Sequence, residues 1–252
     1  MKSRSVGSKN KVVTCYLSEP LCGETTAKID ISTANGNLMI DTLTSAEPVL
    51  ASGTLEYVVN QDPPTRSVKT SNGQTIFTVK STSTGRPWFQ LPWAACNAAT
   101  NWHLHLNPNV QADITARSGG GNVKLNLVGM TLTRVMADSG GGNLEMILPD
   151  HAANLSVIAK TGGGNVNVQI GRGTTGSNVV DAISGAGNVE VRIPIGVAAR
   201  IYATSGWGKE IVDPRFGNIN QHTYQSSDFD SAANKVEITL KSGAGNVIVN
   251  TM

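Results

Sequence analysis

The chain has 252 residues, of which 39% are hydrophobic and only 15% are charged, and its net charge is +2 at pH 7. This near-neutral balance offers no charge excess for an anionic partner, so nucleic-acid binding is not expected. No run approaches the roughly 18 consecutive apolar residues of a membrane-spanning helix, so no membrane insertion by this chain is expected. The many Gly, Ser, Thr and Asn residues instead favour short strands joined by tight turns.

Residues 1–24 are expected to form an N-terminal extension. They begin with MKSRSVGSKNKVV, which is basic but lacks the apolar core of a secretory signal peptide. The three cysteines, Cys15, Cys22 and Cys96, form no C-x-x-C pair, which excludes a zinc ribbon or a thioredoxin motif. Two alternatives stay open for them: a Cys15–Cys22 disulfide that leaves Cys96 free, or three buried thiols.

A glycine-rich motif recurs along the chain and sets its period. SGGGNV at 118–123 has close copies in SGGGNL, TGGGNV and SGAGNV, and two degenerate relatives. From Ser118 to Ser205 the spacing is 21, 22, 23 and 21 residues, which indicates a repeat of about 22 residues. The seven copies begin at Thr33, Ser118, Ser139, Thr161, Ser184, Ser205 and Ser242.

Apolar and polar residues alternate on both sides of each motif. Before Ser118, Ile114 and Ala116 alternate with polar residues, and after it Val123 and Leu125 do the same. This period of two predicts one short strand before each glycine corner and one after it, each with one buried face. A unit of this size cannot bury its apolar face alone, so the units must stack edge to edge. The sequence therefore predicts an all-β, β-solenoid-like stack or a closely related stacked-sheet prism, with two strands in each repeat.

The motif residues are best explained by the corner itself. Glycine accepts positive φ without steric cost, and Asn bonds readily to local backbone. A dinucleotide-binding loop would need a helix after the glycines, and a calcium-binding repeat would need Asp at a period of nine, so no cofactor is expected. The corner asparagines are Asn37, Asn122, Asn143, Asn165, Asn188 and Asn246. We expect the four from 122 to 188 to lie in register on one edge.

The segment NWHLHLNPNVQADITARSGGGNVKLNLVGMTLTRVMADSGGGNLEMILP resembles the toast-rack domain. That domain ends the cell-wall-active antibiotic response proteins, the Lia-type envelope-stress regulators, and it also occurs in proteins described as candidate adhesins. The resemblance covers about residues 25–252 and implies a right-handed all-β stack without catalytic residues or cofactor. It divides the chain into an N-terminal region with a hairpin and a Trp-rich insert at 25–110, and a repeat stack at 111–252 with an insert near 213–235.

Aromatic residues mark the candidate binding positions. Trp88, Phe89 and Trp93 crowd into one segment that interrupts the repeat, in a chain that is only 5% aromatic. They form either an exposed patch for a glycan or a protein, or a hydrophobic cap that closes the stack, and the cap is favoured. Trp207 stands inside the degenerate corner SGWGKE as a fourth candidate contact, whereas Trp102 aligns with inward positions and is expected in the core.

Two histidines, His103 and His105, share one face of a strand. A zinc ion would need a third or fourth ligand, and His151 and His222 lie far away in sequence, so solvated surface histidines and no metal are expected. The chain has no G-x-S-x-G motif and no assignable pair of carboxylates, so it is not expected to be an enzyme.

The resemblance implies a non-enzymatic interaction or scaffold domain of a bacterial cell-envelope protein, related to envelope stress. The alternative is a surface adhesin that binds carbohydrate or protein through the Trp-rich segment, and an enzyme on a solenoid groove is a distant third. The expected partner is an unidentified protein or glycan, and terminal strands could also join copies of the chain into a homo-oligomer. The expected location is the cell envelope outside the cytoplasm, with the cytoplasm as the alternative.

Overall fold

The computed structural model describes residues 11–44, 48–59, 62–81 and 100–252. Within these ranges the chain forms strands, turns and bends and no helix, which confirms the all-β prediction. None of these segments forms a helix with the length and apolar character needed to cross a membrane.

The strands are, in chain order, β1 Val12–Pro20, β2 Thr26–Thr33, β3 Gly36–Thr42, β4 Val49–Val58, β5 Thr65–Ser71, β6 Gln74–Lys80, β7 Thr100–Leu106, β8 Gln111–Ser118, β9 Val123–Asn126, β10 Leu132–Ser139, β11 Leu144–Ile147, β12 Ser156–Thr161, β13 Val166–Gln169, β14 Ser177–Ser184, β15 Val189–Ile193, β16 Ala198–Ser205, β17 Glu210–Val212, β18 Gly217–Asn220, β19 Thr223–Gln225, β20 Lys235–Ser242 and β21 Val247–Thr251.

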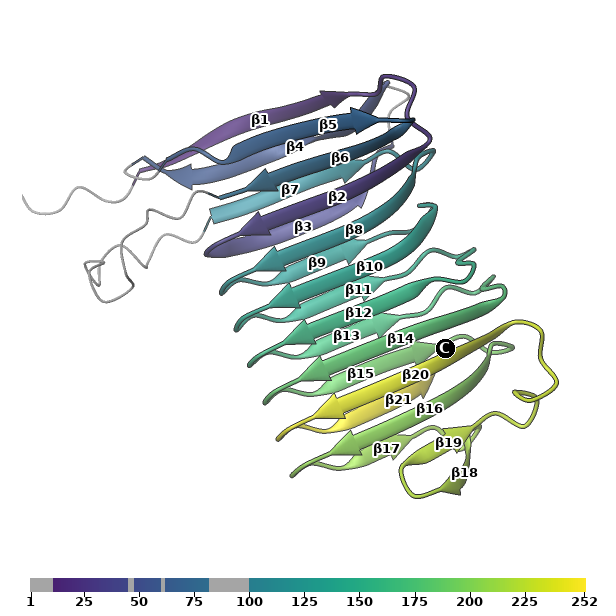
Figure 1. Ribbon diagram of the computed structural model, residues 1–252. Coiled ribbons are helices and arrows are strands. Elements are labelled where there is room, and N and C mark those ends of the chain that lie inside the picture. The colour runs from purple at the N-terminus through teal and green to yellow at the C-terminus, as the bar shows by residue number, and fades with distance from the viewer. Residues whose placement is uncertain (1–10, 45–47, 60–61, 82–99) are drawn as a thin grey trace, which may run out of the picture.

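These strands build two sheets that face each other along the whole stack (Figure 1). Sheet A has the order β1-β4-β7-β3-β9-β11-β13-β15-β21-β17, and sheet B has the order β18-β19-β16-β20-β14-β12-β10-β8-β2-β6-β5. A rung is one strand of sheet B, a corner and the next strand, which belongs to sheet A. Neighbouring rungs pair in parallel, and motif residues pair with motif residues, as Val135 does with Ile114 on one side and Val157 on the other.

The core lies between the two sheets. Because rungs are in register, each inward position becomes a column of like residues, and Ile114, Val135 and Val157 are all buried. The residues two positions before the corners form a second buried column, in which five of the seven are alanines, as Ala116 and Ala137 are. Trp102 is 2% exposed, which confirms its predicted place in the core. Alternating inward residues therefore fill a continuous, narrow core along the stack.

The stack contains an eighth rung that the motif alignment does not reveal. Strand β6 pairs in parallel with β2, and β7 pairs in parallel with β3, so β6 and β7 form a rung like the others. In sequence, residues 81–99, which hold the Trp-rich segment, separate these two strands. Alignment on the glycine motif therefore finds seven rungs, because this rung has lost the motif but kept both strands. Part of the expected N-terminal extension also joins the fold, since β1 pairs antiparallel with β4 at the edge of sheet A.

The rungs do not follow chain order at the C-terminal end. Strands β20 and β21 lie between β14/β15 on one side and β16/β17 on the other (Figure 1, yellow between green). The rung that ends the stack is therefore the penultimate one in sequence. Residues 213–234 carry the chain from this last rung back to the inserted position, and β18 and β19 lie within that connection, where β19 extends sheet B beyond β16.

The corner glycines are needed for close approach rather than for positive φ. The described glycines with positive φ are Gly23, Gly53, Gly73, Gly129, Gly176 and Gly196, and none belongs to the motif. At the first and third glycine of the corners, an added Cβ would run into backbone of the preceding rung, as at Gly142 with the carbonyl of Gly121. The middle position is open, because nothing lies within 4 Å of a Cβ built at Gly141. The expected role of positive φ is thus wrong, and the requirement is stacking at one strand spacing.

We predict that Gly142→Ala destabilises the protein and that Gly141→Ala does not. The new methyl group at position 142 must push apart two hydrogen-bonded rungs, which should lower the free energy of unfolding by about 3 kcal/mol. At position 141 the change should stay within about 1 kcal/mol of wild type, because the site is open. Urea unfolding followed by circular dichroism measures both variants, and equal stabilities would contradict the stacking argument.

Candidate functional site

The corners form one continuous edge of the molecule, held by a row of hydroxyl groups. The Ser139 hydroxyl donates to the carbonyl of Gly121 in the preceding rung at 2.8 Å and accepts the N–H of Gly142 in its own rung at 2.9 Å. Thr161 makes the same two bonds, to Gly142 and Gly164. The first motif residue therefore both closes its own corner and ties it to the rung before. The same pair of bonds is made by Ser118, Ser184, Ser205 and Ser242.

The corner asparagines form a second row on the same edge. The Asn122 side-chain oxygen accepts the backbone N–H of Asn143 at 2.8 Å, and Asn143 accepts that of Asn165 at 2.9 Å. The ladder thus joins each side chain to the backbone of the next rung, not amide to amide. It runs in spatial order through Asn37, Asn122, Asn143, Asn165, Asn188 and Asn246, and it ends on the backbone N–H of Lys209.

Trp207 is the one large side chain in a described corner of the motif type. It occupies the middle position, which holds Asn35 in the first copy of the motif and Gly or Ala in the other five, and it is 90% exposed. Its rung is the last of the stack, so the indole stands at one end of the corner edge.

The Trp-rich segment belongs to the same edge through its two ends. The Ser81 hydroxyl accepts the backbone N–H of Ala34 at 2.7 Å, and the Thr100 hydroxyl donates to the carbonyl of Asn35 at 3.2 Å. Ala34 and Asn35 form the corner of the adjacent rung, so Ser81 and Thr100 both lie at the corner edge. The candidate residues themselves, Trp88, Phe89 and Trp93, lie outside the described residues.

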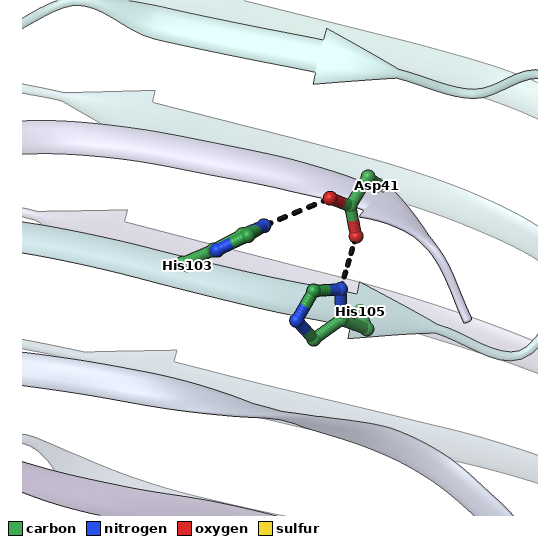
Figure 2. Close-up of side chains that lie close together, drawn as sticks. All are labelled: Asp41, His103 and His105. Atoms are coloured by element: carbon green, nitrogen blue, oxygen red, sulfur yellow. Dashed lines mark hydrogen bonds and ion pairs between the residues drawn. The ribbon is translucent and has the colours of Figure 1, made fainter. Parts of the chain in front are cut away.

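The outer face of sheet A carries a compact polar cluster that the sequence does not reveal (Figure 2). Asp41 lies on β3, and its two carboxylate oxygens meet the rings of His103 and His105 on β7. His103 Nε2 and Asp41 Oδ2 are 2.8 Å apart, and His105 Nδ1 contacts Asp41 Oδ1. The histidine side chains are 39% and 36% exposed and that of Asp41 is 19% exposed. The histidines are therefore partly buried and paired, rather than freely solvated as expected.

Asp41 completes the cluster because of strand register. Asp41 pairs with His105 across β3 and β7, and Met39 pairs with His103, so the three side chains project from one face. The alternation of buried Leu38 and Ile40 with outward residues was available in the sequence. The pairing of β3 with β7 was not available, because the glycine motif is missing from the rung that contains β7.

Several side chains hold the insert near 213–235 in place. Phe229 is buried and Tyr224 packs against the core, so both anchor this segment. The Arg215 guanidinium donates to the carbonyls of Pro194 and Val197, and its burial lowers its pKa. The backbone N–H of Arg215 donates to Asp213, which lowers the pKa of that carboxyl.

The remaining metal and redox candidates are separate from the cluster. His222 pairs with Glu210 at 2.7 Å, near the end of the stack. Cys15 is a half-buried free thiol and Cys22 an exposed one, so the structure shows neither the Cys15–Cys22 disulfide nor the alternative of three buried thiols. Cys15 donates to the carbonyl of Leu55, and burial raises the pKa of its thiol. Cys96 lies outside the described residues.

A shallow groove follows the outer face of sheet A and contains ion-paired carboxylates. It has a volume of about 150 Å³ and is lined in part by Glu145, Glu190 and Arg192. Glu145 pairs with Lys124 at 3.1 Å, and Glu190 pairs with Arg192 at 2.8 Å. Carboxylates that are already neutralised in this way suit a polar surface better than acid–base catalysis.

Comparison with known proteins gives one family and a shared fold. A family model described as the N-terminal domain of toast_rack, DUF2154, matches residues 2–169. The structure of a candidate cell adhesion protein from Clostridium sporogenes aligns at 16% identity with a TM-score of 0.63, over 96% of this chain and 100% of the other. A candidate adhesin from Bacteroides fragilis aligns at 12% identity over 96% and 98% of the two chains, with a TM-score of 0.33, which does not establish a shared fold. None of the curated proteins compared with the chain matches it.

We predict that Ser139→Ala weakens the stack and that Ser139→Thr preserves it. Ser139 is 1% exposed, so its loss leaves a carbonyl and an N–H without partners at a buried site. The free energy of unfolding should fall by about 1–3 kcal/mol in the alanine variant. Threonine keeps the hydroxyl and already occupies the equivalent position at Thr161, so the loss should be less than half as large. Thermal and urea unfolding compare the two, and a threonine variant as unstable as the alanine variant would contradict the hydroxyl row.

Proposed function

The chain belongs to the family of toast-rack N-terminal domains, and from this membership we propose that it is a non-enzymatic scaffold domain of a bacterial cell-envelope protein that binds a partner protein at its corner edge. The fold that it shares with the Clostridium sporogenes protein, which is described as a candidate for cell adhesion, supports a place at the cell surface. A role in the response to envelope stress is part of the same proposal and rests on the family resemblance.

The exposed indole of Trp207 carries this proposal. At the middle corner position no backbone of the neighbouring rung blocks a side chain, as the open space at Gly141 shows, and here that position holds the side chain with the largest apolar surface. Tryptophan is among the residues that contribute most to protein interfaces, because it buries a large rigid surface and keeps one N–H donor. A fully exposed indole at the end of a rigid edge is thus suited to insert into a partner.

The rigidity of the edge supports the same role. Each corner is bound to its neighbours by a backbone bond, a hydroxyl bond and an asparagine bond, as at Ser139 and Asn143. A surface that is already ordered loses little conformational entropy when it binds. The partner can therefore gain affinity from few contacts.

We predict that Trp207→Ala abolishes most binding to the envelope and that Tyr16→Ala does not. Tyr16 is a matched control, because it is 86% exposed and lies on β1 at the opposite end of the stack. Labelled chain would be incubated with envelope fractions of the bacterium that encodes it, and the bound fraction measured against concentration. The Trp207 variant should bind about tenfold more weakly, as expected for an interface anchor.

The same assay distinguishes the class of partner. Binding that is lost after protease treatment of the envelope supports a protein partner. Wild-type affinity in the Trp207 variant, or an equal loss in the Tyr16 variant, would refute the role of the corner edge.

The adhesin alternative rests on the Trp-rich segment. The described residues that flank it, Ser81 and Thr100, bond to the corner of the adjacent rung. A glycan array would compare wild type with a Trp88→Ala, Trp93→Ala double variant. Saturable glycan binding that the double variant loses, and Trp207→Ala keeps, would favour carbohydrate recognition over the protein partner.

A further inference from the structure

The cluster of Asp41, His103 and His105 has the composition and geometry of a metal site (Figure 2). One potential ligand atom from each residue lies within 4.8 Å of the others. We propose that this cluster binds one divalent transition-metal ion of the zinc class, through one nitrogen of each imidazole and one carboxylate oxygen. The open side of the cluster, where both histidines are more than one-third exposed, leaves room for water as a fourth ligand.

The ligand types select the class of metal. Two imidazoles and one carboxylate are a common ligand set for zinc and its neighbours in the first transition row. Calcium and magnesium prefer a full set of oxygen ligands, which this cluster does not offer. The single negative charge of Asp41 partly neutralises the ion and leaves the bound water as the exchangeable position.

The distances need only a small adjustment to admit an ion. At metal–ligand bonds of about 2.0 Å, neighbouring ligands of a tetrahedral ion stand about 3.3 Å apart. His103 Nε2 and Asp41 Oδ2 are now 2.8 Å apart, so the groups must separate by about half an ångström. In the metal-free protein each imidazole N–H bridges to the carboxylate, and the metal would take the place of these protons. The displaced proton moves to the other ring nitrogen, so the histidines bind as neutral ligands.

The backbone holds the three ligands on interior strands of sheet A. Strand β7 is bonded on both sides, to β4 and to β3, and β3 is bonded to β9 as well. Buried Trp102 donates from Nε1 to the carbonyl of Glu56 at 2.9 Å, which fixes the segment just before His103. Ligands on such strands are more precisely positioned than ligands on loops.

Asn126 supplies an independent observation at the same place. It is the register partner of Asp41 on β9, one strand spacing away on the side opposite His105. Its Oδ1 is buried and has no hydrogen-bond partner among the described residues. A buried oxygen without a donor is uncommon, and it places an unfilled acceptor next to Asp41, on the β9 side, that a water held beside the site would satisfy.

A metal ion here would link β7 to β3 close to Thr100, the first residue of β7. The inference does not depend on the proposed partner or on Trp207. It predicts a site that can be loaded and emptied in the isolated chain.

The test is zinc titration of the tag-free chain after EDTA treatment, by isothermal calorimetry. A Cys22→Ser, Cys96→Ser background removes two thiols that would also bind zinc. One equivalent should bind saturably, and the affinity should fall at least about tenfold in each of His103→Ala, His105→Ala and Asp41→Asn. The control variants His151→Ala and His222→Ala should bind as the parent does.

Two further measurements separate ligation from folding. In EDTA the ligand variants should melt near the parent, because their side chains are partly exposed, and zinc should raise the melting temperature of the parent and the controls only. Nitrogen-15 spectra of the imidazoles should show zinc-dependent shifts at His103 and His105 but not at His151 or His222. The proposal is overturned if no saturable binding occurs up to millimolar zinc, if the ligand variants bind as the parent does, or if only other histidines shift.

Discussion

The fold depends on one constraint, which is that equivalent residues of successive rungs must stack directly above one another at the spacing of two hydrogen-bonded strands. At that spacing the carbonyl of one corner fills the space that a Cβ of the next would occupy, so Gly121 and Gly142 cannot carry side chains. The same stacking lets one hydroxyl serve two rungs and one Asn side chain reach the next backbone N–H. Apart from the middle position, each residue of the motif is thus determined by its contacts with the neighbouring rung.

Because the corners fix the register of neighbouring strands, they also fix which outward-facing side chains lie next to one another on the outer faces of the sheets. Side chains far apart in sequence become neighbours in rows, which is how His105, Asp41 and Asn126 come to lie on three adjacent strands. Equivalent residues also stack in rows along the corner edge. There, however, the middle residue of each corner does not pack against the backbone of the neighbouring rung. Trp207 stands at such a position. The repeat therefore provides both a rigid frame and positions where side chains can vary without harming it.

The alternation around Ser118 and its copies was sufficient to predict strands, corners, the buried columns and Trp102. It was not sufficient for three features, each for a physical reason. The β6/β7 rung keeps its strands but lacks the glycine motif, so its pairing with β2 and β3, and hence the meeting of Asp41 with His103, is not visible in sequence. The position of β20 between β14 and β16 cannot be predicted from sequence, because every rung offers the same kind of strand edge for pairing. Close approach and positive φ both demand glycine, so composition alone cannot separate them.

The position of the C-terminal rung bears on how the chain completes itself as it is made. Strands β16 and β17 emerge before β20 and β21, yet they occupy the place beyond them. During synthesis the edge of β14/β15 stays without its final neighbour until β20 and β21, residues 235–251, have also been made. A chain cut short before Lys235 exposes an unpaired edge of the very kind that the stack repeats, and such an edge is readily recognised by proteases and chaperones. Strands β20 and β21 therefore complete the pairing of the rungs on both sides of them.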